Sequence, residues 1–194
     1  METVPSPQPK KHFLKEVLQF TLIALVIILP LRFFVAQPFV VSGASMDPTF
    51  NDGNYLIVDE LSYRFESPRR GDVVVFKYPY DEKRYLIKRV IGLPGETVEM
   101  KAGAIIIKNG ANKEGLSLDE PYIDDKNNLM YGNLSVTLGD DEYFVMGDNR
   151  IASSDSRIWG PLKRELIVGR PLVRLLPVGR LGLMPGSYHG YADF

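Results

Sequence analysis

Ser45 lies in a segment of small residues and a proline, Ser42–Thr49 (SGASMDPT). Gly43 and Ala44 allow another backbone to approach closely, and Pro48 favours a turn. A serine in such a place can serve as a nucleophile when a neighbouring base activates it. The alternative is an ordinary Ser/Gly turn, and the segment taken alone favours that alternative.

Lys88 is the residue that could act as this base, because it interrupts the apolar stretch Leu86–Ile91. If its side chain points inward, burial disfavours the ammonium and lowers its pKa, and Arg89 next to it adds to the shift. A neutral amine can then accept the proton of a serine hydroxyl. Because strand side chains alternate between two faces, the sequence is equally compatible with a solvent-facing lysine.

A third segment is dense in charged and hydroxyl side chains, from Gly147 to Arg157 (GDNRIASSDSR). Acids and arginines at this spacing predict a hydrogen-bonded ion-pair network, and no histidine joins the carboxylates to make a metal site. A serine hydroxyl from this segment could hold the lysine amine in place. The alternative is a solvated loop.

The composition narrows the chemistry further. The 194 residues are one domain's worth of chain, and 24 acidic against 23 basic side chains give a net charge of −1, so a generic nucleic-acid binder is disfavoured. The absence of cysteine excludes disulfides, thiolate metal sites and a cysteine nucleophile. The two histidines, His12 and His189, lie near opposite ends of the chain, which disfavours a catalytic triad that contains histidine. We expect no metal and no organic cofactor.

These residues follow a long apolar segment. Residues 17–36 carry one charged side chain, Arg32 near the end, and 20 residues suffice to cross about 30 Å of hydrocarbon as a helix. In residues 1–16 three lysines outnumber two glutamates, which predicts a cytoplasmic tail. We therefore expect a tail over 1–16, a transmembrane anchor over 17–36 and an extracytoplasmic domain over 37–194. The alternatives are a cleaved secretory signal, processed before Ser45, and a buried soluble helix.

Beyond the anchor the pattern changes to short apolar or alternating runs separated by turn residues, which predicts a mainly β domain. Asn109-Gly110 is a hairpin signal, and 111–133 is polar enough to be a loop or small excursion. The apolar run 171–184 is interrupted by Arg174, Pro177 and Arg180, so we expect no second span there. The expected strands are 55–58, 73–77, 86–91, 97–101, 104–108, 135–138, 143–146 and 167–175.

In combination, these segments resemble those of bacterial type I signal peptidases, which are membrane-anchored Ser-Lys proteases. The resemblance covers the chain from the anchor to about Gly182. It rests on four motifs in family order: SGASMDPT at 42–49, RGDVVVF at 70–76, KRVIGLPGE at 88–96 and GDNRIASSDSR at 147–157. It implies an antiparallel β-sheet catalytic domain of the signal peptidase type behind a single transmembrane helix.

The resemblance also implies a role for each matching residue. Ser45 would be the nucleophile and its backbone N–H an oxyanion donor, Lys88 the general base, and Ser153 the serine that orients the lysine. Some family members carry a serine at the position of Gly43, so the oxyanion site here would rest on backbone donors. A structural network is expected from Arg89, Asp148, Asp155 and Arg157. A shallow apolar substrate pocket is expected from Phe39, Val41, Met46, Leu86 and Ile87.

The function implied is cleavage of signal peptides from exported precursor proteins after small residues, at sites of the A-x-A type. The implied partners are these precursors and the lipid bilayer, with no nucleic acid; the sequence does not predict an oligomeric state. The membrane would be the plasma membrane or another internal membrane such as a thylakoid. Two alternatives remain, namely a self-cleaving Ser-Lys regulator and a non-catalytic membrane-tethered β module that binds a partner.

Overall fold

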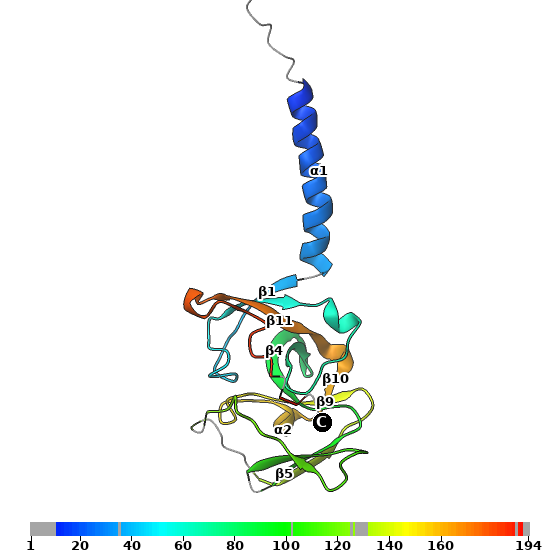
Figure 1. The fold of residues 1–194 in the computed structure, drawn as a ribbon, viewed down its shortest axis with the longest axis vertical. Coiled ribbons are helices and arrows are strands. Elements are labelled where there is room, and N and C mark those ends of the chain that lie inside the picture. Colours follow the sequence, from blue (N-terminus) through cyan, green and yellow to red (C-terminus); the bar gives the residue numbers. More distant parts are fainter. Residues whose placement is uncertain are drawn as a thin grey trace, which may run out of the picture.

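The protein consists of one long helix and a β domain made of two antiparallel sheets (Figure 1). The fold is that of a computed structural model. The structure describes residues 11–34, 36–101, 103–124, 126, 132–188 and 190–191.

Helix α1 (Lys11–Phe34) projects from the β domain, and the chain enters the domain through β1 (Ala36–Val40) (Figure 1). The large apolar side chains described in α1 are exposed, Phe20 with 79% of its surface. The predicted anchor, 17–36, thus lies in α1 except for its last two residues, and residue 36 already belongs to a strand. Among the described residues, no helix is both long enough and apolar enough to cross a membrane.

The larger sheet has eight strands in the order β1-β2-β11-β3-β4-β9-β10, with β12 paired to β11. Every pairing in it is antiparallel, as the resemblance to signal peptidases implies. Its remaining strands are β2 (Tyr55–Asp59), β3 (Val73–Tyr78), β4 (Asp81–Gly92), β9 (Glu142–Met146), β10 (Leu162–Lys163), β11 (Ile167–Leu176) and β12 (Gly182–Leu183). Short helices accompany it: η1 (Ser62–Arg64), α2 (Ser156–Trp159), η3 (Arg164–Leu166) and η4 (Val178–Arg180).

The smaller sheet has four strands in the order β7-β6-β5-β8. They are β5 (Thr97–Lys101), β6 (Ala104–Lys108), β7 (Leu116–Ser117) and β8 (Leu134–Thr137). The predicted hairpin after β6 exists, but its connection runs from Asn109 to Gly115. The Asn109 side chain accepts the N–H groups of Ala111 and Asn112, which builds a longer turn than the two-residue one that Asn-Gly favours.

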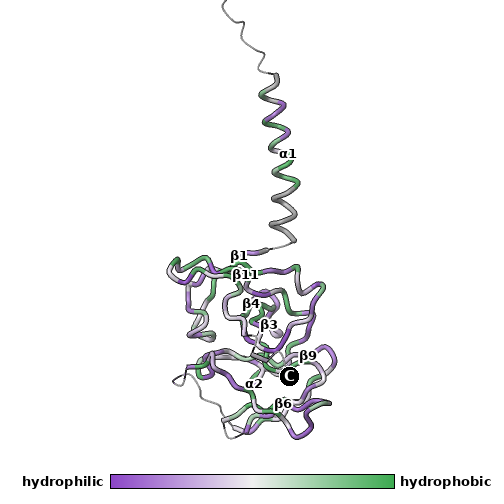
Figure 2. The backbone as a smooth tube through the Cα atoms, in the orientation of Figure 1, coloured by the Kyte–Doolittle hydropathy of each residue, from purple (hydrophilic) through white to green (hydrophobic). Residues whose placement is uncertain are grey.

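The core lies where alternating apolar positions of the strands face inward, and hydrophobic stretches are accordingly short and spread through the β domain (Figure 2). One buried cluster contains Met46, Phe50 and Leu56, each at most 1% exposed, beneath the segment that carries Ser45. A second one, between β3, β4 and β9, includes Val90 and Val145. The two elements that carry the candidate dyad therefore rest on close-packed interior, which limits their movement.

Strand β4 is longer than predicted and begins at Asp81 rather than at residue 86. Together β3 and β4 form a hairpin in which Phe76 pairs with Leu86 and Val74 with Lys88. The exposed first half of β4 contains the charged run DEKR, 81–84, which lies outside the predicted strand 86–91. Its second half is buried and places Lys88 in the middle of the sheet, between β3 and β9.

Candidate active site

Ser45 and Lys88 are brought together across 43 residues of sequence. The Nζ atom of Lys88 lies 2.7 Å from Ser45 Oγ and donates to the carbonyl oxygen of Ile87 at 2.9 Å. Ser45 sits in a tight turn in which the N–H of Asp47 bonds to the carbonyl of Ala44. The lysine is buried, with 2% of its surface exposed. The alternative of a solvent-facing lysine is therefore excluded.

Burial changes the acid–base behaviour of this lysine. Removal of the amine from water lowers the pKa of Lys88 from its ordinary value of 10.5 to about 8, while the nearby carboxylates of Asp155 and Asp148 oppose the shift. An amine with a pKa near 8 is partly neutral close to physiological pH. The pair thus has the geometry and the proton affinity that a hydroxyl and its general base require.

The segment after β9 packs directly against the backbone of Ser45. The N–H of Asn149 donates to the Ser45 carbonyl oxygen at 3.1 Å. Gly147 leaves no room for a side chain, since a Cβ there would lie 2.3 Å from that oxygen and from Ser153 Oγ. Glycine at this position is therefore required for the loop to support the serine.

Ser153 is buried next to these groups, although Lys88 makes its hydrogen bonds to Ser45 and Ile87. Among the residues described, Ser153 Oγ has no hydrogen bond of ordinary geometry. It nevertheless lies close enough to Asp155 to contribute to the lowered pKa of that carboxyl. The orienting role of Ser153 stays a prediction.

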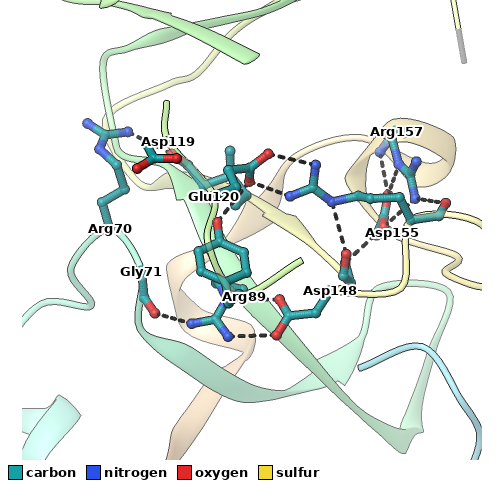
Figure 3. Close-up of polar contacts among 12 residues, drawn as sticks. Arg70, Gly71, Arg89, Asp119, Glu120, Asp148, Asp155 and Arg157 are labelled. Carbon is teal, nitrogen blue, oxygen red and sulfur yellow. Dashed lines mark hydrogen bonds and ion pairs between the residues drawn. The ribbon is translucent and has the colours of Figure 1, made fainter. Parts of the chain in front are cut away.

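Arg89, the residue after the lysine, forms a fully buried ion pair with Asp148. Its Nε and Nη2 atoms bond to the two carboxylate oxygens at 2.8 and 2.6 Å, and the carbonyl oxygens of Gly71 and Gly186 accept from Nη1. Figure 3 shows the contacts to Gly71 and Asp148. Thr49, four residues after Ser45, donates to Asp148 at 2.5 Å. The pair thus links the serine segment, β4 and the loop after β9.

Tyr122 covers the other side of this guanidinium, with Arg89 Cζ 3.9 Å from the centre of its ring. The Tyr122 hydroxyl donates to Glu120 at 2.8 Å, and Glu120 in turn forms a buried ion pair with Arg150. Tyr191 lies beside Tyr122, with 3.2 Å between the hydroxyl oxygens. The sequence did not point to Tyr122, Glu120 or Tyr191, because they follow no motif and meet the site only in the folded chain.

Asp155 and Arg157 also form an ion pair, with 2.8 Å between Arg157 Nε and Asp155 Oδ1 (Figure 3). Asp155 accepts from the N–H of Gly147 at 3.0 Å and caps the short helix α2 through the N–H of Arg157. Burial raises the pKa of the Asp155 carboxyl, but its hydrogen bonds and the Arg157 charge outweigh this and hold the pKa below its ordinary value. Its negative charge therefore persists at neutral pH beside the lysine.

An apolar pocket of about 100 Å³ opens next to the dyad. Four of the residues expected to bind substrate line it, namely Phe39, Val41, Leu86 and Ile87. Met46 is instead fully buried in the core cluster below. The pocket is completed by Val40, Ser42, Leu56, Val75 and Tyr85 together with Ser45 and Lys88. The alternation of β2, β3 and β4 could have indicated some of these residues, but only the folded sheet shows which face meets the serine.

The backbone around Gly43 is held in a conformation that favours glycine, with φ at +91°. Its N–H donates to the Asp52 carboxylate at 2.8 Å. No group of three or more His, Asp or Glu side chains gathers in metal-binding geometry within the described part of the chain. The arrangement offers a hydroxyl, a partly neutral amine and an apolar pocket side by side.

Comparison with known proteins identifies, over most of the chain, the family that the sequence motifs resemble. Residues 14–176 match the family described as signal peptidase, peptidase S26. The chain is 40% identical over 195 residues to a probable signal peptidase I-1 of Synechocystis sp., covering 97% of this chain and 94% of that protein. It is also 40% identical over 176 residues to a signal peptidase I of Leptolyngbya laminosa, covering 86% and 82% of the two chains.

One solved structure is also similar to part of the chain. A crystal structure of a signal peptidase I from Enterococcus faecalis V583 matches with 30% sequence identity and a TM-score of 0.45. The match covers 54% of this chain and 97% of that one.

Proposed function

The chain belongs to the signal peptidase family, peptidase S26, whose reaction is signal peptide cleavage, and we propose that it cuts precursors with Ser45 as nucleophile and Lys88 as general base. The observation that carries this assignment is the buried contact of 2.7 Å between Lys88 Nζ and Ser45 Oγ. The hydrolase activity follows from the family. The residues that perform it are the proposal.

The reaction starts with the neutral amine of Lys88, which takes the proton of the Ser45 hydroxyl as Oγ attacks the carbonyl carbon of the scissile peptide bond. The resulting ammonium gives this proton to the leaving amine when the C–N bond breaks. A water molecule then gives a proton to Lys88 and attacks the acyl-enzyme, and the ammonium returns that proton to Ser45. Protons balance over the cycle, and one water is consumed.

The oxyanion that develops during the attack needs hydrogen-bond donors. The backbone N–H of Ser45 is the proposed donor, because Gly43 offers no side chain for this task and its own N–H is bound to Asp52. The residues before the cut would occupy the apolar pocket. Its volume of about 100 Å³ supports a preference for small side chains such as alanine.

We also propose the membrane arrangement that the sequence predicts. Residues 17–36 would anchor the chain, 1–16 would lie in the cytoplasm and 37–194 would face outward, in the plasma membrane or an internal membrane. The projection of α1 from the β domain supports this arrangement (Figure 1). Precursor proteins with a signal helix in the same bilayer would then meet the dyad at high effective concentration.

Purified full-length protein in detergent, incubated with a synthetic precursor peptide, tests the proposed dyad. Ser45→Ala and Lys88→Ala should each abolish cleavage, and Lys88→Arg should also be inactive because guanidinium stays protonated. Mass spectrometry should place the wild-type cut after a small residue. Circular dichroism of each variant provides the control that the fold persists.

Normal cleavage by Ser45→Ala or Lys88→Ala would rule out the dyad. The same experiment separates the two alternative functions. A self-cleaving regulator would cut its own chain and leave the peptide intact. A non-catalytic binding module would cut neither, and a serine-reactive acylating probe would fail to label it.

A further inference from the structure

A second pocket, of about 280 Å³, also borders the dyad. Ser42, Ser45, Leu86 and Lys88 line both pockets, so the two meet at the nucleophile. Their walls differ in chemistry. The first is mostly aliphatic and aromatic, whereas the second contains Gly43, Tyr78, Arg84 and Ser154.

Arg84 lines the same pocket as Leu86 and Lys88. Leu86 and Lys88 lie two residues apart on one face of β4, and Arg84 comes from the irregularly paired start of that strand. The residues between them, Tyr85 and Ile87, line only the apolar pocket. Leu86 and Lys88 are thus shared by the two pockets, whereas Arg84 belongs to the second pocket alone.

Arg84 carries a charge that no carboxylate compensates among the described residues. Its exposed guanidinium lies 5.7 Å from the centre of the Tyr78 ring, which supports it from one side. The neighbouring acids have other contacts: Glu82 lies near Lys77, and Asp81 accepts from the N–H of Lys83. No acidic side chain lines the second pocket.

We propose that this second pocket receives the first residues after the cleavage site and that Arg84 favours an acidic side chain among them. The inference rests on the proposed function, in which the residues before the cut occupy the apolar pocket. Because the scissile bond lies at Ser45, where the pockets meet, the chain on its other side continues into the second pocket. Arg84 is thus a specificity-determining residue for the mature end of the precursor.

Strand geometry sets the range over which Arg84 can act. Arg84 lies four positions before Lys88, which corresponds to roughly 13 Å along a β-strand. An extended substrate covers that distance in about four residues, and the length of the arginine side chain shortens it further. The preferred acidic residue should therefore lie within the first four positions after the cut.

The test uses synthetic precursor peptides that are identical up to the cut and carry Asp, Asn or Lys at one of the first four positions after it. For the full-length enzyme in detergent, kcat/KM of each peptide is measured by mass spectrometry. At one or more positions the Asp peptide should exceed the Lys peptide by about two- to fivefold, the range for an exposed ion pair. This ratio should shrink in 0.5 M salt because screening weakens the attraction.

Two substitutions on the same strand make the assignment specific. Arg84→Glu should invert the ratio of kcat/KM between the Asp and Lys peptides. Lys83→Glu is the matched control: it makes the same change of charge one residue away, outside the second pocket, and should keep the wild-type ratio.

An unchanged ratio in Arg84→Glu, or an equal change in both variants, would overturn the inference while leaving the proposed function intact. If the wild type cut none of the peptides, or if Ser45→Ala cut them as well, the proposed function would fall and the inference with it. The two failures are thus distinguishable in one data set.

Discussion

At the scale of single residues, the most consequential property of the site is the proton affinity of Lys88. Burial lowers the pKa of its amine to about 8, against the opposing charges of Asp155 and Asp148. A base must be unprotonated to act, so the enzyme should lose activity as the pH falls through this value. With Lys88 as the proposed base, its pKa should set the pH range in which the site works.

We expect kcat/KM for a neutral peptide substrate to rise with pH and to reach half its maximum near pH 8, the pKa of Lys88. The amine is protonated below this pH and free above it. The measurement is a rate profile from pH 6 to 10 at constant ionic strength, with protein stability followed in parallel. A flat profile, or a midpoint near the ordinary value of 10.5, would contradict this assignment.

The same shift links pH to folding. Between pH 8 and 10.5 the lysine of the unfolded chain keeps its proton while that of the folded chain has lost it. The unfolded state thus binds more protons, and the contribution of Lys88 to the free energy of unfolding increases with pH over this range. The site is arranged for catalysis at some cost in stability at lower pH.

The sequence predicted the candidate dyad and the charged network of Arg89, Asp148, Asp155 and Arg157, but not every residue that contacts them. Ser45 and Lys88 stand in motifs whose residue types already suggest chemistry. Tyr122 and Arg84 stand in none, and their roles depend on contacts with Arg89 and with the second pocket that form only in the folded chain. Met46 was expected in the substrate pocket because it is apolar and follows Ser45. In the structure its side chain packs into the core.

At the scale of elements, two features escaped prediction for identifiable reasons. Strand β1 contains Pro38, and a proline lacks the backbone N–H that a strand uses for pairing, so the sequence does not indicate a strand there. Because β1 lies at the edge of the larger sheet, the proline is tolerated. The first half of β4 is charged and exposed, so it lacks the apolar alternation by which the other strands are found. Strands are recognised in a sequence by the alternation of buried apolar residues. These two segments are strands in which few residues are buried, so the alternation is missing.

The buried guanidinium of Arg89 connects several elements through its hydrogen bonds. Strand β4 supplies the arginine, the loop after β9 supplies Asp148, and the segments at 71 and 186 supply carbonyl oxygens. The segment between β7 and β8 covers the guanidinium with Tyr122. Stability of the site therefore depends on segments distant from the dyad in sequence.

Tyr122→Leu should lower the free energy of unfolding by about 2 kcal/mol or more, since a desolvated cation–π contact and the packing of the ring are both lost. Tyr122→Phe keeps the ring over Arg89 and removes the hydroxyl bond to Glu120, so it should cost less, about 1 kcal/mol. Urea unfolding of the three proteins measures both effects. Equal losses in the two variants would show that the hydroxyl, and not the ring, is what stabilises Arg89.

At the scale of the whole molecule, the long helix and the β domain have separable tasks. The dyad, both pockets and the buried network belong to residues beyond α1. The helix should therefore matter for meeting a membrane-bound substrate and not for the chemical step.

A variant that begins at Ala36, and so retains β1, should cleave a short soluble peptide within about threefold of the full-length rate. Its processing of a precursor embedded in lipid vesicles should fall by roughly a hundredfold or more, because the shared membrane no longer concentrates enzyme and substrate. Replacing 17–35 by leucines of equal number is the matched control and should preserve processing. Equal loss on both substrates would mean that α1 supports the fold of the site.

The carbonyl oxygen of Gly186 that accepts from Arg89 has a consequence for the order of events during synthesis. A growing chain that has not yet reached residue 186 contains the serine and the lysine but lacks this acceptor and the aromatic residues that follow it. The Arg89 guanidinium then has Asp148 and the Gly71 carbonyl as partners but lacks its second carbonyl acceptor. We therefore expect the buried network beside the dyad to be completed only after residue 186 has been synthesised.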